Sequence, residues 1–396
     1  MNIKKYDVII IGAGASGLMC GIEAIKRNRS VLIIDHNKRV GNKILISGGG
    51  KCNFTNYELS AKNYLSKNPH FCKSAISRFN QWEFLDLIYK YNIEFEEREF
   101  GRLFTVDGSK DIIDLLLNEG KKINFSLKTK IVNIDKTDQV FRVEVNDGEK
   151  KIYSSNSLVV ATGGISYSKL GATDFGYKIA KKFNISLIDR EEALVPLIVN
   201  KKYFILSGIA LNAIVTLKRE KKEIISFNEN LLFTHKGLSG PAILQVSSYF
   251  KRGDKLIIDL LPKIDISKKL IEFKEEKIKK QVNTILSNYL PKKVINLLFE
   301  SSLLEKQLYS ISKNDINDIG KKIKKLEISP IKKDSYDKAE VTIGGIDTTE
   351  LSSKTMGSKK IEGLFFIGEV IDIVGWLGGY NLQWAWASGW VAGQYV

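Results

Sequence analysis

A strand, a glycine turn, a helix and a second strand follow one another in the first 35 residues. Residues 6–11 (YDVIII) form the continuous apolar run that is typical of a parallel strand buried on both faces. The stretch GAGASG at residues 12–17 follows directly and opens a predicted helix over residues 18–26. A second apolar strand, residues 30–34, ends at Asp35. This order and spacing predict an N-terminal dinucleotide-binding domain of the Rossmann-like α/β class.

Each part of this motif has a physical role in such a domain. Gly12 permits the tight turn, Gly14 lets the backbone approach a pyrophosphate, and Gly17 allows close packing of helix on strand. The helix N-terminus offers free N–H groups and a partial positive charge to the phosphates. Asp35 is expected to accept hydrogen bonds from ribose hydroxyls. The motif by itself does not separate FAD from NAD.

A glycine-rich segment at residues 42–56 is the most unusual stretch of the chain. Three successive glycines, residues 48–50, are flanked by Ser, Lys, Cys, Asn and Thr. We expect no stable helix or strand here, because glycine favours neither. The backbone N–H groups of such a loop can reach a ligand closely, and a surface loop without ligand is the alternative.

Residues 46–56 (ISGGGKCNFTN) resemble the signature of a bacterial flavoprotein family. Its members include an aminoacetone oxidase, a bile-acid-pathway flavin reductase and a ribosomal-RNA dihydrouridine synthase. This chain has Lys51 where the family usually has Arg, and Thr105 and Ser168 where it usually has Pro. The other matching segments follow in order over nearly the whole chain: residues 101–104 (GRLF), 162–167 (TGGISY), 232–241 (LFTHKGLSGP), 342–345 (TIGG), 355–359 (TMGSK), 363–372 (GLFFIGEVID) and 378–387 (GGYNLQWAWA).

The resemblance implies FAD, held by both ends of the chain. A strand at residues 364–367 and a helix over residues 382–392 would complete the cofactor domain, with the helix N-terminus aimed at the flavin. The residues expected at the cofactor are Gly12, Gly14, Ala15, Ser16, Gly17, Asp35, His36, Lys43, Ser47, Gly48, Lys51, Cys52, Asn53, Ile131, Val132, Ala161, Thr162, Gly163, Gly164, Gly368, Glu369, Asp372, Gly379, Tyr380, Asn381 and Leu382.

Two residues are candidates for catalysis. Reduction of a C=C bond at a flavin also needs an acid on the far side of the substrate. Cys52 has Lys51 beside it to tune its pKa, and His235 lies between a predicted strand and a glycine turn. The alternatives are a packing role for Cys52 and a loop-fixing hydrogen bond for His235. We find no second strand-linked GxGxxG, so NADH or NADPH is expected only as a transient electron donor.

The middle of the chain has a different pattern. Residues 191–262 contain the predicted strands 194–199, 212–218, 223–227, 231–234 and 255–260, which suggest an inserted small β-barrel subdomain. Residues 263–328 read as a helical, basic subdomain that is broken at Pro291. The FAD-binding domain would therefore be discontinuous, with residues 1–190 as its first part. Residues 329–396 would return first to the β subdomain and then to the FAD-binding domain. An inserted domain of this kind usually covers the substrate site.

The charge balance leaves the partner open. The chain has 61 Lys and Arg against 45 Asp and Glu, a formal net charge of +16. Residues 251–334 hold 20 basic and 12 acidic residues. A polyanionic partner such as ribosomal RNA is one interpretation, and the lysine bias of an AT-rich genome is the other.

The three cysteines, Cys20, Cys52 and Cys72, have no CxxC spacing, which argues against a disulfide scaffold and against a metal site. This favours a cytoplasmic protein, and no stretch has the length of a membrane span. Three functions stay open. They are a small-molecule FAD oxidoreductase for amine oxidation or C=C reduction, reduction of uridine in ribosomal RNA, and a non-enzymatic flavin-binding module.

Overall fold

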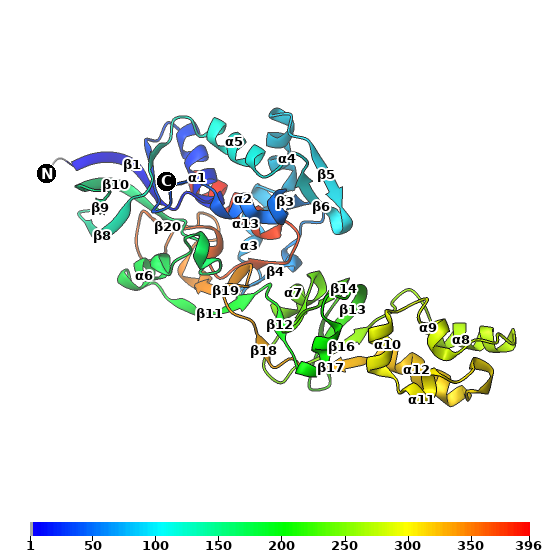
Figure 1. Ribbon diagram of the computed structural model, residues 1–396. Coiled ribbons are helices and arrows are strands. Elements are labelled where there is room, and N and C mark those ends of the chain that lie inside the picture. Colours follow the sequence, from blue (N-terminus) through cyan, green and yellow to red (C-terminus); the bar gives the residue numbers. More distant parts are fainter. Residues whose placement is uncertain (1–2) are drawn as a thin grey trace. The chain divides into compact units, whose positions relative to one another are not determined.

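A computed structural model describes residues 3–396 of the chain, which divide into two compact units (Figure 1). Unit 1 takes the chain up to Glu191 and again from Glu340 to Val396, and unit 2 takes Glu192–Ala339. Unit 1 has the Rossmann-like arrangement, which confirms the predicted mixed α/β class. No helix among residues 3–396 combines the length and the apolar character that crossing a membrane requires.

A sheet of seven strands forms the centre of unit 1 within the described residues. Its order is β7-β2-β1-β10-β9-β8, and β20 pairs with β10. The middle strands are parallel, so that Ile10 lies beside Ile33 on one side and Val159 on the other. Phe365 pairs next to Val159 and brings the C-terminal part of the chain into the sheet. The bounds are β1 (Ile3–Ile11), β2 (Val31–Ile34), β7 (Asn124–Ser126), β8 (Lys130–Thr137), β9 (Val140–Asn146), β10 (Lys150–Val160) and β20 (Leu364–Phe366).

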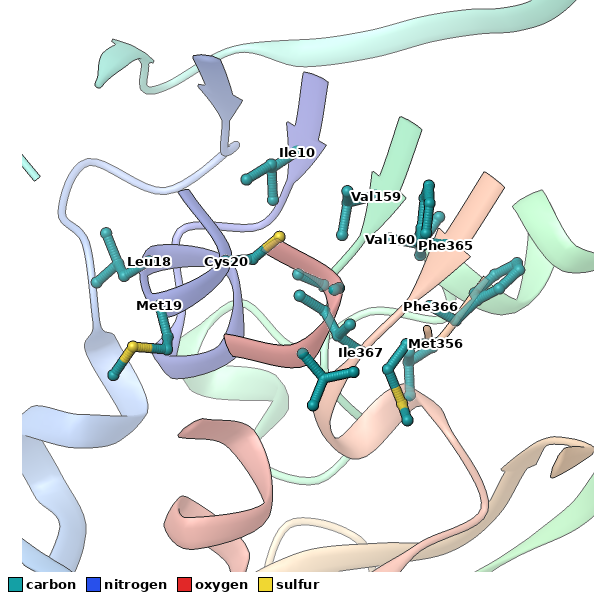
Figure 2. Packing of buried hydrophobic residues seen from close by; sticks show 14 of the residues in the cluster. Ile10, Leu18, Met19, Cys20, Val159, Val160, Met356, Phe365, Phe366 and Ile367 are labelled. Atoms are coloured by element: carbon teal, nitrogen blue, oxygen red, sulfur yellow. The ribbon is translucent and has the colours of Figure 1, made fainter. Parts of the chain in front are cut away.

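The first and last helices pack closely on each other. Gly389 of α13 lies so near α1 that a Cβ there would come within 2.4 Å of the carbonyl oxygen of Ser16. Figure 2 shows side chains of β1, β10, β20 and α1 in one buried cluster, among them Ile10, Phe366 and Cys20. The helices of unit 1 are α1 (Ala15–Lys26), α2 (Asn42–Ile46), α3 (Cys72–Arg78), α4 (Gln81–Lys90), α5 (Lys110–Glu119), α6 (Phe175–Lys182) and α13 (Tyr380–Gly393).

Unit 1 also contains short strands outside the main sheet. Strands β3 (Asn53–Asn56), β5 (Phe95–Arg98) and β6 (Arg102–Thr105) form one small sheet. Two more pairs are β4 (Tyr64–Leu65) with β21 (Val374–Gly375), and β11 (Leu187–Ala193) with β19 (Val341–Ile346).

Unit 2 contains a second sheet of seven strands within the described residues and a group of helices. The strand order is β17-β16-β13-β14-β15-β12-β18, with the long hairpin β13–β14 in the middle. The strands are β12 (Leu197–Ile198), β13 (Ala210–Arg219), β14 (Lys222–Phe233), β15 (Gly237–Ser239), β16 (Lys255–Asp259), β17 (Leu326–Ile328) and β18 (Lys332–Lys333). The helices are α7 (Pro241–Ser247), α8 (Ile266–Glu275), α9 (Val282–Leu286), α10 (Lys292–Leu298), α11 (Ser301–Leu304) and α12 (Lys313–Lys324). Within this unit, Figure 1 shows α8–α12 gathered beyond β16 and β17.

Three sequence-based expectations about elements are wrong. The glycine-rich segment 42–56 was expected to contain neither helix nor strand, yet it includes the short helix α2 and the strand β3. Residues 125–134 alternate between apolar and polar side chains, which predicts one half-buried strand. The structure splits this stretch into β7 and β8, and Lys128 between them has a positive φ of 54°. The strands expected at residues 223–227 and 231–234 are the one strand β14. Its polar residues 228–230 stay in register with β13, and two of them face solvent.

Candidate functional site

The turn between β1 and α1 is built so closely that only glycine fits at two positions. Gly12 has a φ of 109°, and a Cβ there would lie 2.4 Å from the carbonyl oxygen of Ala161. A Cβ at Gly17 would lie 2.0 Å from the carbonyl oxygen of Gly12. Gly14 differs, because a Cβ there would meet no atom within 4 Å. The turn is therefore packed on its inner side and open at Gly14.

The N-terminus of α1 begins at this open position. The first intrahelical bond runs from the Leu18 amide to the Gly14 carbonyl at 2.9 Å. The amides of Ala15, Ser16 and Gly17 precede this first helical donor, so the helix itself offers them no acceptor. Their N–H groups and the helix dipole make this end suited to an anion such as a pyrophosphate.

Asp35 lies at the C-terminal end of β2 and holds two backbone amides. Its Oδ2 accepts from the Ala13 amide and its Oδ1 from the Asn37 amide, each at 2.8 Å. Each carboxylate oxygen has two lone pairs, so this arrangement leaves capacity for hydroxyl donors. His36 lies beside it, with Nδ1 3.7 Å from Asp35 Oδ1.

The glycine-rich loop is fixed by backbone bonds. The Cys52 amide donates to the Ser47 carbonyl at 3.0 Å, and the Ser109 amide donates to the Gly50 carbonyl at 2.8 Å. Gly48 and Gly49 both have positive φ values, 58° and 70°. A Cβ at Gly49 would meet no atom within 4 Å, so the loop has an open side where its backbone is accessible.

Cys52 is fully buried under this loop. Burial raises the pKa of its thiol to about 12, so the thiol keeps its proton at neutral pH. The Nζ of Lys51 lies 3.7 Å from a carboxylate oxygen of Glu96. The catalytic role of Cys52 stays a prediction, and its burial is the observation that weighs against direct contact with a substrate.

The start of α13 is held against β3, so both ends of the chain meet here. Gly379 has a φ of 94°, and a Cβ there would lie 2.3 Å from the carbonyl oxygen of Thr55. The Asn53 carboxamide, in the orientation that satisfies its neighbours, accepts from the Gly379 amide at 3.1 Å. The Asn381 side chain binds the backbone of Gly375, accepting from its amide at 2.8 Å and donating to its carbonyl at 2.9 Å. Tyr380 and Leu382 lie in the first turn of α13, ahead of the Gln383 amide, which donates to the Gly379 carbonyl at 2.9 Å.

Glu369 is the centre of a polar cluster at the C-terminal end of the main sheet. Its carboxylate accepts from Lys43 Nζ at 2.7 Å, from Ser166 Oγ at 3.1 Å and from the Thr342 amide at 3.0 Å. A Cβ at Gly164 would lie 2.5 Å from Glu369 Oε1, so the glycine pair after β10 lies directly over this cluster. Lys43 was expected at the cofactor phosphates, and in this structure its ammonium group is paired with Glu369.

Asp372 holds a neighbouring loop. Its Oδ2 accepts from the Lys67 amide at 2.9 Å and from Ser66 Oγ at 3.3 Å. Burial raises the pKa of this carboxyl group. Both of these partners belong to the segment of unit 1 that directly follows β4.

The resemblance also implies that the backbone near Ile131 and Val132 holds the adenine of FAD, and these residues lie at the start of β8. The pairing of β8 with β9 shifts register between Ile131 and Asn133, so Val132 opposes no residue of β9. The Val132 side chain is exposed, and Ile131 is half-buried. The backbone of Val132 is therefore accessible for a ligand, as the family resemblance implies.

His235 belongs to unit 2, in the turn between β14 and β15. Its side chain is exposed. Thr234 holds the turn, because its Oγ1 accepts from the Gly237 amide at 3.0 Å and from the Lys236 amide at 3.3 Å. The role of His235 stays a prediction.

Five polar residues of unit 1 belong to this site although the sequence did not single them out. Ser166 and Thr342 contact Glu369 directly. The Arg102 side chain lies against the backbone ahead of α13, since a Cβ at Gly378 would lie 2.8 Å from Arg102 Nε. Four of the five lie inside segments that match the family, and only Glu340 lies outside them, so their signal was present without a role. The five are Arg102, Ser166, Tyr167, Glu340 and Thr342.

These features fit FAD. The open glycine turn and the free N-terminus of α1 suit a pyrophosphate, and the carboxylate of Asp35 suits a ribose. Asp35 follows β2 and Glu369 follows β20, and β1 and β10 lie between these two strands in the sheet. The cluster around Glu369 therefore lies on the other side of the glycine turn, where the rest of a long dinucleotide would extend. When bound, FAD supplies hydride transfer, while the protein positions the reactants and manages protons.

Comparison with known proteins agrees with this reading. Residues 6–395 match the family described as HI0933-like protein Rossmann domain. A ribosomal RNA dihydrouridine synthase of Escherichia coli (strain K12) is 41% identical over 399 residues, which cover 99% of this chain and 98% of that protein. A 3-dehydro-bile acid delta(4,6)-reductase of Clostridium scindens (strain ATCC 35704 / DSM 5676 / VPI 13733 / 19) is 28% identical over 404 residues, covering 97% of each.

A solved structure shows the same fold at greater distance. A quinol-fumarate reductase with menaquinol molecules aligns with a TM-score of 0.54 and 16% identity, over 100% of this chain and 71% of that chain. At this identity the likeness concerns the fold alone. The family match over residues 6–395, together with the dinucleotide site above, identifies the chain as a member of the HI0933-like family and as an FAD-dependent oxidoreductase.

Proposed function

We propose that this protein reduces a uridine of ribosomal RNA to dihydrouridine, with FAD as the hydride carrier. The observation that carries the proposal is the 41% identity, over 99% of the chain, to a protein named ribosomal RNA dihydrouridine synthase. A second protein of that name, from Haemophilus influenzae (strain ATCC 51907 / DSM 11121 / KW20 / Rd), is 42% identical over 391 residues. The more distant bile-acid relative is named a reductase as well.

The distribution of charge supports an RNA partner. Unit 2, residues 192–339, has 28 Lys and Arg against 17 Asp and Glu, a net charge of +11 in 148 residues. Unit 1 has a net charge of only +5 in its 248 residues. A genome-wide lysine bias would spread the excess over both units. Its concentration in unit 2 favours contacts with phosphates there.

The electron donor is proposed to be NADH or NADPH. FAD must be reduced again after each turnover, and no other strand-linked GxGxxG motif follows the first one in the sequence. We therefore propose that the nicotinamide binds transiently at the flavin face and not in a domain of its own. NADH and NADPH are cytoplasmic reductants, so the proposed donor would be present where ribosomal RNA is.

A reconstituted reaction tests the proposal. The FAD-loaded protein is incubated without oxygen with NADPH or NADH and ribosomal RNA that lacks the modification, and the RNA is digested and analysed by mass. We expect one uridine to gain two mass units, because two hydrogens are added. Reduction of the flavin without any dihydrouridine in the RNA would overturn the proposed substrate. A steroid-type conjugated enone in a parallel reaction tests the small-molecule alternative.

A further inference from the structure

Resting on the function proposed above, we propose that Glu340 donates the proton that accompanies hydride addition to the uracil ring. In this scheme Arg102 and Tyr167 are positioning residues that hold the carboxyl group and set its charge state. Cys52 and His235 were the candidates for this task in the sequence. Glu340 is the stronger candidate, because His235 belongs to unit 2 and Cys52 is fully buried, whereas Glu340 belongs to unit 1 and is half-buried.

Glu340 is attached to the cluster that surrounds Glu369. Its backbone carbonyl accepts from Ser166 Oγ at 3.2 Å, and the same hydroxyl also lies 3.1 Å from Glu369 Oε1. Two residues further on, Thr342 Oγ1 accepts from the amides of Ile165 and Ser166, at 3.1 and 3.3 Å. The first residues of β19 are thereby fixed to the turn after β10. Glu340 stands at the same end of the sheet as the expected flavin contacts.

Arg102 connects Glu340 to the start of α13. Its side chain runs along Gly378, which directly precedes the helix N-terminus, and its guanidinium carbon lies 5.3 Å from the ring centre of Phe100. The positive charge of Arg102 acts on the Glu340 carboxyl group and lowers its pKa. Arg102 thus lies at Gly378, next to the helix end that is expected to point at the flavin, and its charge reaches the Glu340 carboxyl group.

Tyr167 is held in an unusual conformation beside the same carboxyl groups. Its φ is 61°, a left-handed value that a bulky residue adopts only when its surroundings impose it. Burial raises the pKa of its hydroxyl group, and the charges of Glu340 and Glu369 raise it further. The Tyr167 hydroxyl group therefore keeps its proton more firmly than an ordinary tyrosine does, under the influence of both carboxyl groups.

The environment of Glu340 suits a proton donor that works at neutral pH. Burial, opposed by Arg102, raises the pKa of Glu340 to about 7. The neighbouring Glu369 carboxylate forms an ion pair with Lys43, at 2.7 Å. A general acid is most effective when its pKa lies close to the working pH. The Glu340 side chain also keeps part of its surface exposed, whereas Cys52 is fully buried.

The proposed step is balanced. The double bond between carbons 5 and 6 of uracil is lost, carbon 6 gains the hydride that reduced FAD supplies, and carbon 5 gains the proton from Glu340. Glu340 changes from the carboxylic acid to the carboxylate and recovers a proton from water. The two electrons come from NADH or NADPH through FAD.

The test compares the wild-type protein with Glu340→Gln, which keeps the shape of the side chain but cannot donate a carboxyl proton. We expect E340Q to bind FAD and to be reduced by NADPH as the wild type is, while its rate of dihydrouridine formation falls about 100-fold or more. The wild-type rate should decline as the pH rises above about 7, and E340Q should lose this dependence. Glu144→Gln is the control, because Glu144 is an exposed residue of β9.

A second measurement does not depend on catalysis. Glu340 is protonated more easily in the folded protein than in the unfolded chain, so wild-type stability is complete at low pH and is lost as the pH rises through about 7. The melting temperature of the FAD-loaded wild type should therefore fall relative to E340Q between about pH 5.5 and about pH 8.5. A constant difference would overturn the assigned protonation.

The outcomes separate the inference from the function on which it rests. If the wild type forms dihydrouridine and E340Q forms it at the same rate, Glu340 is not the donor and the proposed function stands. If the wild type reduces its flavin but never forms dihydrouridine, the proposed function fails and the inference fails with it. Glu340→Asp retains a carboxylic acid and should recover part of the lost rate of dihydrouridine formation. If E340D were as slow as E340Q, the role of Glu340 as proton donor would be contradicted.

Discussion

The three glycines of the turn between β1 and α1 are explained by two different requirements, the packing of the fold and the approach of a ligand. Gly12 and Gly17 are required by the fold itself, because the carbonyl oxygens of Ala161 and Gly12 lie where their Cβ atoms would be. Gly14 is not required by the fold, since its Cβ would project into open space and its φ of −87° suits any residue. Its glycine is explained by a ligand that approaches the backbone there.

Gly14→Ala should therefore separate folding from cofactor binding. We expect the FAD-free variant to melt at the wild-type temperature, because the methyl group meets no protein atom within 4 Å. Its affinity for FAD should fall by about tenfold or more, which is about 1.4 kcal/mol. Thermal melting and equilibrium titration with FAD check the two parts.

Gly12→Ala is the matched comparison. It should lower the melting temperature of the FAD-free protein as well, because its Cβ would overlap the Ala161 carbonyl. If G14A binds FAD as tightly as the wild type, the pyrophosphate does not lie at this turn and the site must be reassigned.

Local spacing allowed the turn and Asp35 to be predicted, but it did not allow Glu340 to be found. The glycines and the acid belong to one short motif whose geometry is nearly independent of the rest of the chain. Glu340 depends on partners from two distant segments, represented by Arg102 and Ser166. In the sequence it is only an acid ahead of an apolar strand. Its pKa results from burial, which a sequence motif does not encode.

At the level of elements, one basic surface in the helical part of unit 2 can be defined from the contacts. The segments on either side of Gln281 and Gln307 form a bridge, with the Val282 amide 3.0 Å from the Lys306 carbonyl. This pairing brings three exposed lysines onto neighbouring stretches of chain. We call Lys279, Lys280 and Lys306 the lysine ridge.

Neutralising the lysine ridge should weaken RNA binding. The triple variant K279Q/K280Q/K306Q is expected to bind ribosomal RNA more weakly and to lower the slope of log affinity against log salt by about two units. Its FAD content and its reduction by NADPH should be unchanged, since these residues belong to unit 2. Filter binding over a range of salt concentrations measures the slope.

The control removes the same charge from unit 1. Lys121, Lys122 and Lys150 are also exposed, and K121Q/K122Q/K150Q should leave the salt dependence close to that of the wild type. Equal losses in both variants would mean that the RNA responds only to net charge, and the ridge would have no special role.

The strands of the two sheets were predicted unequally well. Buried parallel strands such as β1 and β2 are continuous apolar runs, and the sequence showed them directly. The sequence predicts two strands, residues 223–227 and 231–234, where the structure has the single strand β14, and the stretch between them, residues 228–230, is polar. Pairing with β13 keeps that stretch extended, and such long-range pairing is not visible in local sequence.

For the whole molecule, the two units divide the proposed task. Unit 1 is closed by elements from both ends of the chain, and the segments that leave and re-enter it pair as β11 and β19. The Asp347 amide donates to the Ser186 carbonyl at 3.0 Å, so the two connections begin side by side. An insertion at such a point does not interrupt the cofactor fold. Unit 2 can therefore carry the positive charge without disturbing the flavin site.

The central claim is that this oxidoreductase acts on ribosomal RNA, and the modification state of that RNA in cells tests it most directly. Ribosomal RNA from the parent strain and from a strain lacking the gene is digested, and every dihydrouridine is mapped by mass. The proposed function predicts that one dihydrouridine disappears in the deletion strain and returns when the wild-type gene, but not the E340Q gene, is restored. Ribosomal RNA with the same dihydrouridines in both strains would contradict it.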